Sequence, residues 1–299
     1  MTSYNFLVST VAPGPLAKAY AACEALARSH YENFPVASML LPEQMRPHVA
    51  AVYAFARRAD DIADEGTAPA EVRRAALDAF LRQLHQAVDS RTGDDLMFVA
   101  VANSIRTLDL PLSLFDDLVS AFAQDTTKTR YASWADVLDY CRRSANPVGR
   151  LVLRIAGYRD AALDRSSDAL CTALQLTNFW QDFGRDWRAG RLYVPRDVQS
   201  ATGADEGQLA MPAMSAAWAQ AIQRCTEFTR ERFDEGRAVC DGVRGRLRWE
   251  LRFTWLGGSR ILDRVERGRS RLMERRPVLG AADVPGLLVR ALSWKPARV

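Results

Sequence analysis

The sequence predicts an all-α protein, and three observations support that prediction. Apolar residues recur at spacings of three and four along most of the chain, as one face of a helix requires. The period-2 alternation of strands is nowhere sustained, and proline and glycine interrupt helical segments instead. With 299 residues, of which 48% are apolar, the chain can bury a substantial core. We therefore expect one all-α domain over residues 1–299, with its site in the bundle core between facing helices.

The individual helices are predicted from periodicity and from the residues that break it. Pro15 suits the first turn of a helix that runs to about residue 31, and Pro42 begins the next one. Asn146-Pro147 interrupts a long apolar helix, so we expect a break there. Further helices are predicted over about 70–89, 94–107, 112–124, 171–187, 212–239, 243–275 and 282–293. The core of the domain spans about 15–275, and residues 190–212 are predicted to be irregular.

The segment from residue 174 to 195, LQLTNFWQDFGRDWRAGRLYVP, carries the strongest functional signal. In a helix, Asn178, Asp182 and Asp186 follow one another at i, i+4 and i+8, so they form one stripe. Most of the remaining surface of that helix is apolar: Leu174, Leu176, Phe179, Trp180 and Phe183. A helix that is apolar nearly all round is buried, and buried carboxylates need a positive partner. The segment therefore predicts a bound cation.

A second stripe occurs earlier, in YAFARRADDIAD, residues 53 to 64. Its members share one helical face: Tyr53, Arg57, Asp60 and Asp64. Asp61 lies beside that face and is able to join it. The flanking positions are again apolar: Val49, Val52, Ala54, Phe55, Ala56, Ala59, Ile62 and Ala63. The second stripe therefore has the same character as the first.

Magnesium is the cation that these stripes favour. Mg²⁺ prefers hard oxygen ligands and usually shares them with substrate phosphates, so two facing aspartate helices suit a group of Mg²⁺ ions that holds a diphosphate. Either stripe alone is more typical of a solvated helix face than of a site. Two stripes, each within an apolar helix and each near an arginine, Arg57 or Arg191, favour the site.

Composition and missing motifs exclude other classes. The net charge is only +4, and no basic block or basic-aromatic stripe indicates nucleic-acid binding. No Walker loop or G-x-G-x-x-G is present, and the three histidines have no triad or metal-ligand spacing. The five cysteines are scattered, as expected of buried free thiols in a reducing compartment. We see no signal peptide and no apolar run of about 18 residues, so a cytoplasmic protein is expected. A mildly basic surface leaves a peripheral contact with the inner membrane face open.

The two stripes also resemble the two aspartate-rich motifs of the squalene and phytoene synthase family of head-to-head prenyl synthases. YCRRSANPVG, residues 140–149, resembles the short Tyr-Cys…Val-Gly segment that lines the cavity in that family. The resemblance runs from about His30 to Asp263. It implies an all-α prenyl-synthase helical bundle with a central cavity, Mg²⁺, and a prenyl diphosphate substrate that ionises to a carbocation.

The resemblance also implies roles for single residues. The implied Mg²⁺ ligands are Asp60, Asp64, Asn178, Asp182 and Asp186. Contacts to the substrate and its diphosphate are implied for His30, Phe34, Arg57, Tyr140, Asn146, Gln175 and Arg191. The implied cavity is dry, and its aromatic candidates are Phe34, Phe55, Phe179, Trp180, Phe253 and Trp255, although large aromatics at helical spacing are usually plain core.

Departures from the family pattern indicate one branch. Gln181 and Gly258 stand where relatives carry an arginine and a tyrosine near diphosphate. With ENFPVAS, SANPVG and NFWQD, they resemble the bacterial hydroxysqualene synthases of hopanoid pathways. That branch implies conversion of presqualene diphosphate and water to hydroxysqualene and diphosphate without NADPH, with a presqualene diphosphate synthase as a pathway partner. The alternatives are condensation of two prenyl diphosphates, as in presqualene diphosphate, squalene or phytoene synthases, and a non-catalytic helical assembly factor of the same fold.

Overall fold

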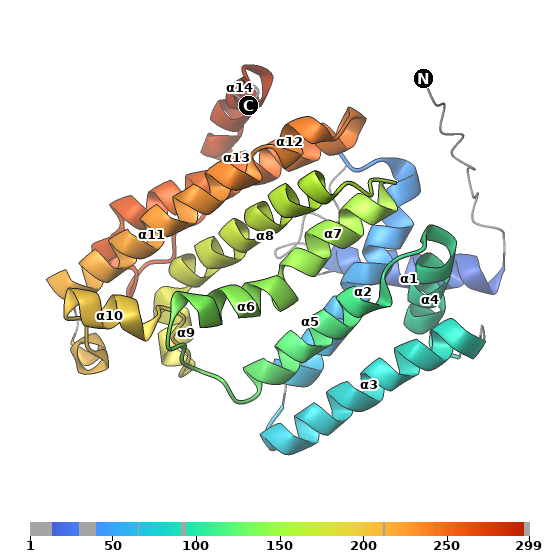
Figure 1. Ribbon diagram of the computed structural model, residues 1–299, viewed down its shortest axis with the longest axis horizontal. Helices are drawn as coiled ribbons and strands as arrows, with labels where there is room; N and C mark the ends of the chain where they lie inside the picture. The colour runs from blue at the N-terminus through green and yellow to red at the C-terminus, as the bar shows by residue number, and fades with distance from the viewer. Residues whose placement is uncertain (1–13, 30–39, 65, 91–93, 212, 296–299) are drawn as a thin grey trace.

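The computed structural model describes residues 14–29, 40–64, 66–90, 94–211 and 213–295 (Figure 1). Its helices are α1 (Pro15–Ser29), η2 (Glu43–Met45), α2 (Arg46–Asp64), α3 (Ala70–Ser90), α4 (Leu96–Leu108), α5 (Leu112–Asp125), α6 (Trp134–Ser144), α7 (Asn146–Ile155), α8 (Ala161–Gln181), α9 (Phe183–Arg188), α10 (Arg196–Thr202), η3 (Glu206–Ala210), α11 (Ala216–Gly236), α12 (Val239–Gly242), α13 (Gly245–Arg267), η4 (Arg269–Arg271), η5 (Ala281–Asp283) and α14 (Val284–Leu292). The all-α prediction is confirmed. In the part of the chain that the structure describes, the nearest thing to a strand is one isolated bridge, between Arg130 and Leu192.

Helix α8 lies at the centre of the bundle, as its apolar surface predicts. It packs against α11 and α13 on one side and against α6 and α7 on the other, and α2 and α5 lie beyond α7 (Figure 1). Leu176 and Trp180 of α8 are completely buried. The indole N–H of Trp180 donates to Thr229 Oγ1 of α11 at 2.8 Å, so the one polar atom of that side chain is satisfied. The middle of α8 is therefore enclosed by the bundle, whereas Arg165 near its start is exposed.

Several predicted boundaries are confirmed. The break at Asn146-Pro147 is real: α6 ends at Ser144 and α7 begins at Asn146, with Pro147 in its first turn, where the missing N–H costs nothing. The short terminal helix predicted over 282–293 is present as η5 and α14. Among the described residues, no helix combines the length and the apolar character that crossing a membrane requires.

Two predictions about the segment after residue 171 are wrong. The helix expected over 171–187 is two helices, because α8 ends at Gln181 and α9 starts at Phe183. Gly184 explains the bend: a Cβ on it would lie 2.6 Å from the Leu272 carbonyl oxygen, so α9 is pressed against the backbone that follows α13. The region 190–212 is not wholly irregular, since it contains α10 and η3. Gly203, with φ of +70°, ends α10 in the left-handed conformation that favours glycine.

Candidate functional site

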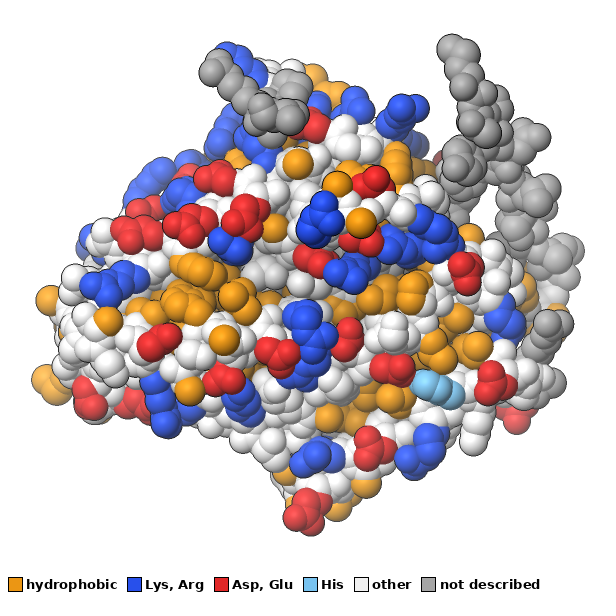
Figure 2. Space-filling model, viewed as in Figure 1, with side chains coloured by type: hydrophobic (Ala, Val, Ile, Leu, Met, Phe, Trp, Pro, Cys, Tyr) orange, Lys and Arg blue, Asp and Glu red, His pale blue; other side chains and the backbone are white. Residues whose placement is uncertain are grey.

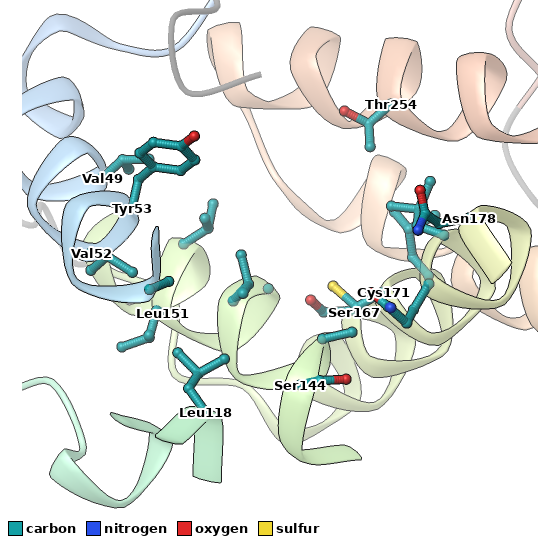
Figure 3. Close-up of a pocket in the computed structure, with 18 of the residues that line it drawn as sticks. Val49, Val52, Tyr53, Leu118, Ser144, Leu151, Ser167, Cys171, Asn178 and Thr254 are labelled. Atoms are coloured by element: carbon teal, nitrogen blue, oxygen red, sulfur yellow. The ribbon is translucent and has the colours of Figure 1, made fainter. Parts of the chain in front are cut away.

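A cavity of about 670 Å³ lies between α2, α5, the α6–α7 junction, α8 and α13 (Figure 3). The charged and amide side chains of its lining are Arg57, Asp60, Gln175, Asn178, Asp182, Arg185, Glu250 and Arg276. Much of the rest is aliphatic, with Val49, Val52, Leu118, Leu151, Leu170 and Leu174 as examples. The volume is in the range of small-molecule sites, and the combination of an apolar interior with a few charged groups is typical of them. The cavity is therefore the candidate active site.

Helix α2 contributes the first stripe to this cavity. Tyr53, Arg57 and Asp60 line it, on the face of α2 opposite to completely buried Phe55. The Arg57 guanidinium lies 3.4 Å from Asp60 Oδ2 and 2.5 Å from Asp61 Oδ1, so Asp61 does join the charged face. Burial and the neighbouring charge of Asp64 raise the pKa of Asp60 to about 6. One arginine therefore does not compensate the carboxylates of this stripe.

The second stripe survives the break between α8 and α9. The Asp182 N–H donates to Asn178 O at 2.9 Å, and the Asp186 N–H donates to Asp182 O at 2.9 Å, so the i, i+4 register continues across the break. Asn178 and Asp182 line the cavity. Burial and the charge of Asp182 raise the pKa of Asp186 to about 7. The three residues therefore stay together, although they do not belong to one helix.

Two arginines from distant segments contact the stripes. The Arg191 guanidinium lies 2.5 Å from Asp64 Oδ1. The backbone N–H of Arg191 donates to the backbone carbonyl oxygen of Asp186 at 2.8 Å, so this residue joins the two stripes. Arg276, from the segment after α13, donates through Nε to Asp182 Oδ1 and through Nη2 to Asp182 Oδ2, the latter at 3.3 Å. Sequence reasoning anticipated Arg191 but missed Arg276, because no local pattern around residue 276 indicates the contact.

A buried carboxyl group that sequence reasoning missed lies against Tyr140. The Tyr140 hydroxyl lines the cavity side of α6 and donates to Asp125 Oδ2 at 2.6 Å. Burial raises the pKa of Asp125 to about 7, and its Oδ1 is buried without a hydrogen-bond partner. The neighbouring charges of Asp64 and Asp60 also raise this pKa, and the charge of Arg191 lowers it. The only signal in the sequence is its position as the last residue of a helix before the 126–133 loop.

The remaining predicted site residues fall into three groups. Gln175 lines the cavity, as expected of a wall residue. Asn146 is not among the described lining residues, and its Oδ1 accepts a hydrogen bond from Thr172 Oγ1 at 3.0 Å, so it ties α7 to α8 instead. His30 and Phe34 lie outside the described residues.

The aromatic residues expected to line the cavity are not the ones that line it in the structure. Phe55, Phe179, Trp180, Phe253 and Trp255 do not line the cavity. Phe179 stacks on Tyr193 with ring centroids 3.7 Å apart, and Phe55 packs between Phe80 and Phe115, so these rings serve the core. Among the described residues, the aromatic side chains of the lining are Tyr53, Phe122 and Tyr140.

The two positions that depart from the family pattern also have defined roles. Gln181 turns toward the C-terminal segment, where its Nε2 donates to Pro277 O at 2.6 Å. A Cβ on Gly258 would lie 2.5 Å from Leu174 Cδ2 and 2.9 Å from Phe233 Cζ. Gly258 therefore permits close packing of α13 on α8 and α11 and does not itself open room for substrate.

The acidic groups of the two stripes have the chemistry that a divalent cation prefers. Within the described ranges, no three His, Cys, Asp or Glu side chains come near enough to one another to hold a metal ion between them. The donors are nevertheless hard carboxylate oxygens, and the pKa values of Asp60 and Asp186 are raised by burial and by neighbouring carboxylates, both of which a bound cation counteracts. The residues present thus fit a divalent ion, for which Arg191 and Arg276 provide part of the positive charge.

Comparison with known proteins identifies the family. The sequence profile of the Squalene/phytoene synthase family matches residues 27–283. A hydroxysqualene synthase of Zymomonas mobilis is 38% identical over 196 residues, which span 64% of each chain, and one of Rhodopseudomonas palustris is 34% identical over 82% of each. The structure of squalene synthase HpnC from Alicyclobacillus acidocaldarius superposes with a TM-score of 0.80 at 39% identity, over 86% of this chain and 96% of that one. This chain belongs to the squalene/phytoene synthase family of enzymes.

Proposed function

We propose that the protein converts presqualene diphosphate and water to hydroxysqualene and diphosphate, in squalene and hopanoid biosynthesis, with Mg²⁺ as cofactor. The observation that carries the proposal is that Asp60 of α2 and Asp182 of α8 line the same cavity, which continues as a mainly aliphatic chamber. The relatives of this chain that are named hydroxysqualene synthases support the choice of reaction. A catalyst of this type needs a charged mouth for the leaving group and a dry interior for the cation.

The charged part of the cavity binds the diphosphate. Arg57, Arg185 and Arg276 line it, and guanidinium groups match the oxygens of a phosphate in a bidentate way. Divalent ions, held by Asp60, Asp64, Asn178, Asp182 and Asp186, would neutralise the negative charge that grows on diphosphate as the C–O bond breaks. Because Arg191 contacts Asp64 and the backbone of Asp186, it holds the two stripes at the spacing in which they meet the diphosphate.

The interior controls the carbocation. Breaking the C–O bond leaves both electrons on diphosphate and a cyclopropylcarbinyl cation in the cavity. Aliphatic walls exclude bulk water, and the rings of Tyr53, Phe122 and Tyr140 supply faces that attract a cation. Water then forms the new C–O bond to the rearranged cation and loses one proton. The chamber must therefore admit one water in a defined position.

Two serines provide polar positions for that water. Ser144 and Ser167 line the cavity away from the stripes, together with Cys171 (Figure 3). The Ser144 hydroxyl is buried and has no hydrogen-bond partner, so it retains an unused donor and acceptor. If they hold the water, Ser144→Ala/Ser167→Ala lowers the share of alcohol in favour of hydrocarbon formed by proton loss, whereas an unchanged product ratio contradicts this role.

The reaction is tested with purified protein, Mg²⁺ and either presqualene diphosphate or farnesyl diphosphate, in the absence of NADPH. An alcohol formed only from presqualene diphosphate, carrying ¹⁸O when the incubation is made in H₂¹⁸O, supports the proposal. A condensed diphosphate or a C30 hydrocarbon formed from farnesyl diphosphate assigns the protein to the condensing synthases instead. Chelation of divalent ions with EDTA abolishes either activity if the metal assignment is correct.

A further inference from the structure

Helix α14 is held firmly against the bundle on one side only. Ala291 is completely buried, and Trp294, just beyond the helix, packs edge-on against Trp255 of α13 with ring centroids 5.4 Å apart. At the start of the helix, Asp283 lies 2.6 Å from the Arg264 guanidinium and accepts the Gly280 N–H at 2.8 Å. In Figure 1, α14 lies at the top of the molecule, outside α13. Its orientation is therefore defined, and its other side faces outward.

The outward side of α14 is apolar. Val284, Leu288 and Leu292 follow one another at i, i+4 and i+8, and Val289 lies beside them. Val284 is 51% exposed, Val289 64% and Leu292 74%. Six of the nine large hydrophobic side chains that are strongly exposed in the described residues lie between 278 and 292. Contiguous apolar surface of this kind, unlike single exposed residues, marks an interaction site.

The same end of the chain is strongly basic. Residues 244–295 contain thirteen Arg and Lys against five Asp and Glu, whereas the rest of the chain contains 27 against 31. Arg290 on α14 and Lys295 just after it are both exposed. Figure 2 shows basic and hydrophobic side chains side by side around this end of the molecule. The apolar side of α14 therefore lies beside the exposed Arg290 and Lys295, in a basic part of the chain.

The sequence profile of the family does not include this helix. The family profile ends at residue 283, and α14 begins at Val284. No residue of α14 lines the described cavity. The exposed side chains thus have no role in the chemistry proposed above, and the question is what covers them.

We propose that the outward side of α14 and the basic residues around it form a docking surface for an anionic lipid bilayer. Apolar side chains inserted among headgroups, with Arg and Lys directed at anionic lipids, are the combination by which amphipathic helices bind membranes. A second copy of the chain is a poorer occupant, because a symmetric contact would bring two basic surfaces together. The inference depends on α14 alone and is independent of the proposed reaction.

The test is flotation of the full chain with vesicles of phosphatidylcholine alone or with added phosphatidylglycerol. The protein is expected to float with the anionic vesicles only, and added salt is expected to weaken binding. Leu288→Glu/Leu292→Glu lowers the bound fraction at least about tenfold, because two buried leucines contribute more than that factor. The matched control is Val72→Glu on α3, a residue that is 56% exposed and belongs to no such cluster; it binds as the parent does.

Charge reversal tests the second half of the surface. Arg290→Glu/Lys295→Glu is expected to lose binding to phosphatidylglycerol vesicles while the melting temperature stays unchanged. Parent-like flotation of Leu288→Glu/Leu292→Glu, or no flotation of the parent chain, overturns the proposal. A third result also overturns it: light scattering shows that the parent chain is an oligomer and the leucine variant a monomer, while vesicle binding is unchanged. The apolar side of α14 is then a contact between copies of the chain. Circular dichroism spectra and melting temperatures, measured in parallel for all variants, establish that they are folded.

Discussion

The two aspartate stripes meet at one cavity but are built differently. Tyr53, Arg57, Asp60 and Asp64 stand on a single unbroken helix, and Arg57 of that same helix contacts Asp60 and Asp61. The second stripe is divided between α8 and α9, and its central carboxylate, Asp182, is held by Arg276 from 94 residues further along. The first stripe therefore depends on local spacing except at Asp64, which the distant Arg191 contacts, and the second depends on how the C-terminal segment packs.

The difference has a physical origin in Gly184. Its lack of a side chain lets α9 approach Leu272 and Met273 to within 3 Å of where a Cβ would be. That approach brings the segment carrying Arg276 to the cavity. Substitution of Asp60 should therefore act mainly on the chemistry, whereas mutations around α9 should affect stability and chemistry together.

The largest effect is expected from the carboxylates themselves. Asp60→Ala or Asp182→Ala should lower turnover by about 10³-fold or more, because each removes charge that stabilises the leaving group's counterions. Steady-state rates on the diphosphate substrate measure this, with circular dichroism to establish that the fold is intact. The control is Asp78→Ala on the exposed side of α3. Retained turnover in either site variant would refute the metal-ligand assignment.

Loss of Arg276 should have a smaller but clear effect. Arg276→Gln is expected to lower kcat/KM by about 10- to 100-fold, because it removes the positive partner of Asp182. Arg276→Lys should recover only part of the activity, since lysine cannot contact a carboxylate in the bidentate manner of arginine. Arg275→Gln, at an exposed neighbouring position, is the matched control. Equal kinetics for the 275 and 276 variants would exclude Arg276 from the site.

Adding a single methyl group at Gly184 should disturb the second stripe, which depends on the packing of α9, and leave the first stripe unchanged. Gly184→Ala is expected to lower the free energy of unfolding by about 1–3 kcal/mol, because the new Cβ meets backbone atoms that cannot move independently. It should also lower turnover, through the displaced Arg276. Gly257→Ala is the comparison, since its Cβ makes only an ordinary 3.5 Å contact with Leu279. Similar urea midpoints for the two variants would contradict the close-approach argument.

The smallest effect is a change of stability with pH in the metal-free protein. Burial raises the pKa of Asp60 to about 6 and the pKa values of Asp125 and Asp186 to about 7. The folded state therefore keeps protons that the unfolded chain releases near pH 4, so the free energy of unfolding falls as pH rises from about 4 to about 7. Urea unfolding in EDTA measures this fall. Asp125→Asn should reduce the slope, and Mg²⁺ should counteract it at the upper end.

An increase of metal-free stability between pH 5 and 7 would contradict that prediction. The depressed pKa values of Asp164 and Asp283, each paired with arginine, act with the opposite sign. Their stabilisation is lost only as pH falls below the ordinary aspartate range, so the two contributions occupy different parts of the curve.

Much of the site could be predicted because its signals are local. Asn178, Asp182 and Asp186 repeat at helical spacing within nine residues, and so do Arg57, Asp60 and Asp64, so periodicity alone groups each set on one face. The apolar surroundings of both sets predicted burial, but among these side chains only Asp182 is buried, and Asp64 and Asn178 are exposed. The break at Pro147 and the terminal helix were predictable for the same reason, since proline and periodicity act on neighbouring residues.

The sequence by itself determined the all-α class and the two aspartate stripes, because backbone sterics and residue spacing along a helix are local properties. Only the tertiary structure decided that Arg276 holds Asp182, that Tyr140 donates to buried Asp125, and that Phe55 and Trp180 belong to the core while Tyr53 and Phe122 line the cavity. It also decided that Gly258 serves helix packing. Some of these contacts join residues that are far apart in the chain. Others distinguish residues of similar hydrophobicity on one helix, such as Tyr53 and Phe55. In both cases the outcome depends on which helix faces meet, and no local sequence pattern specifies that.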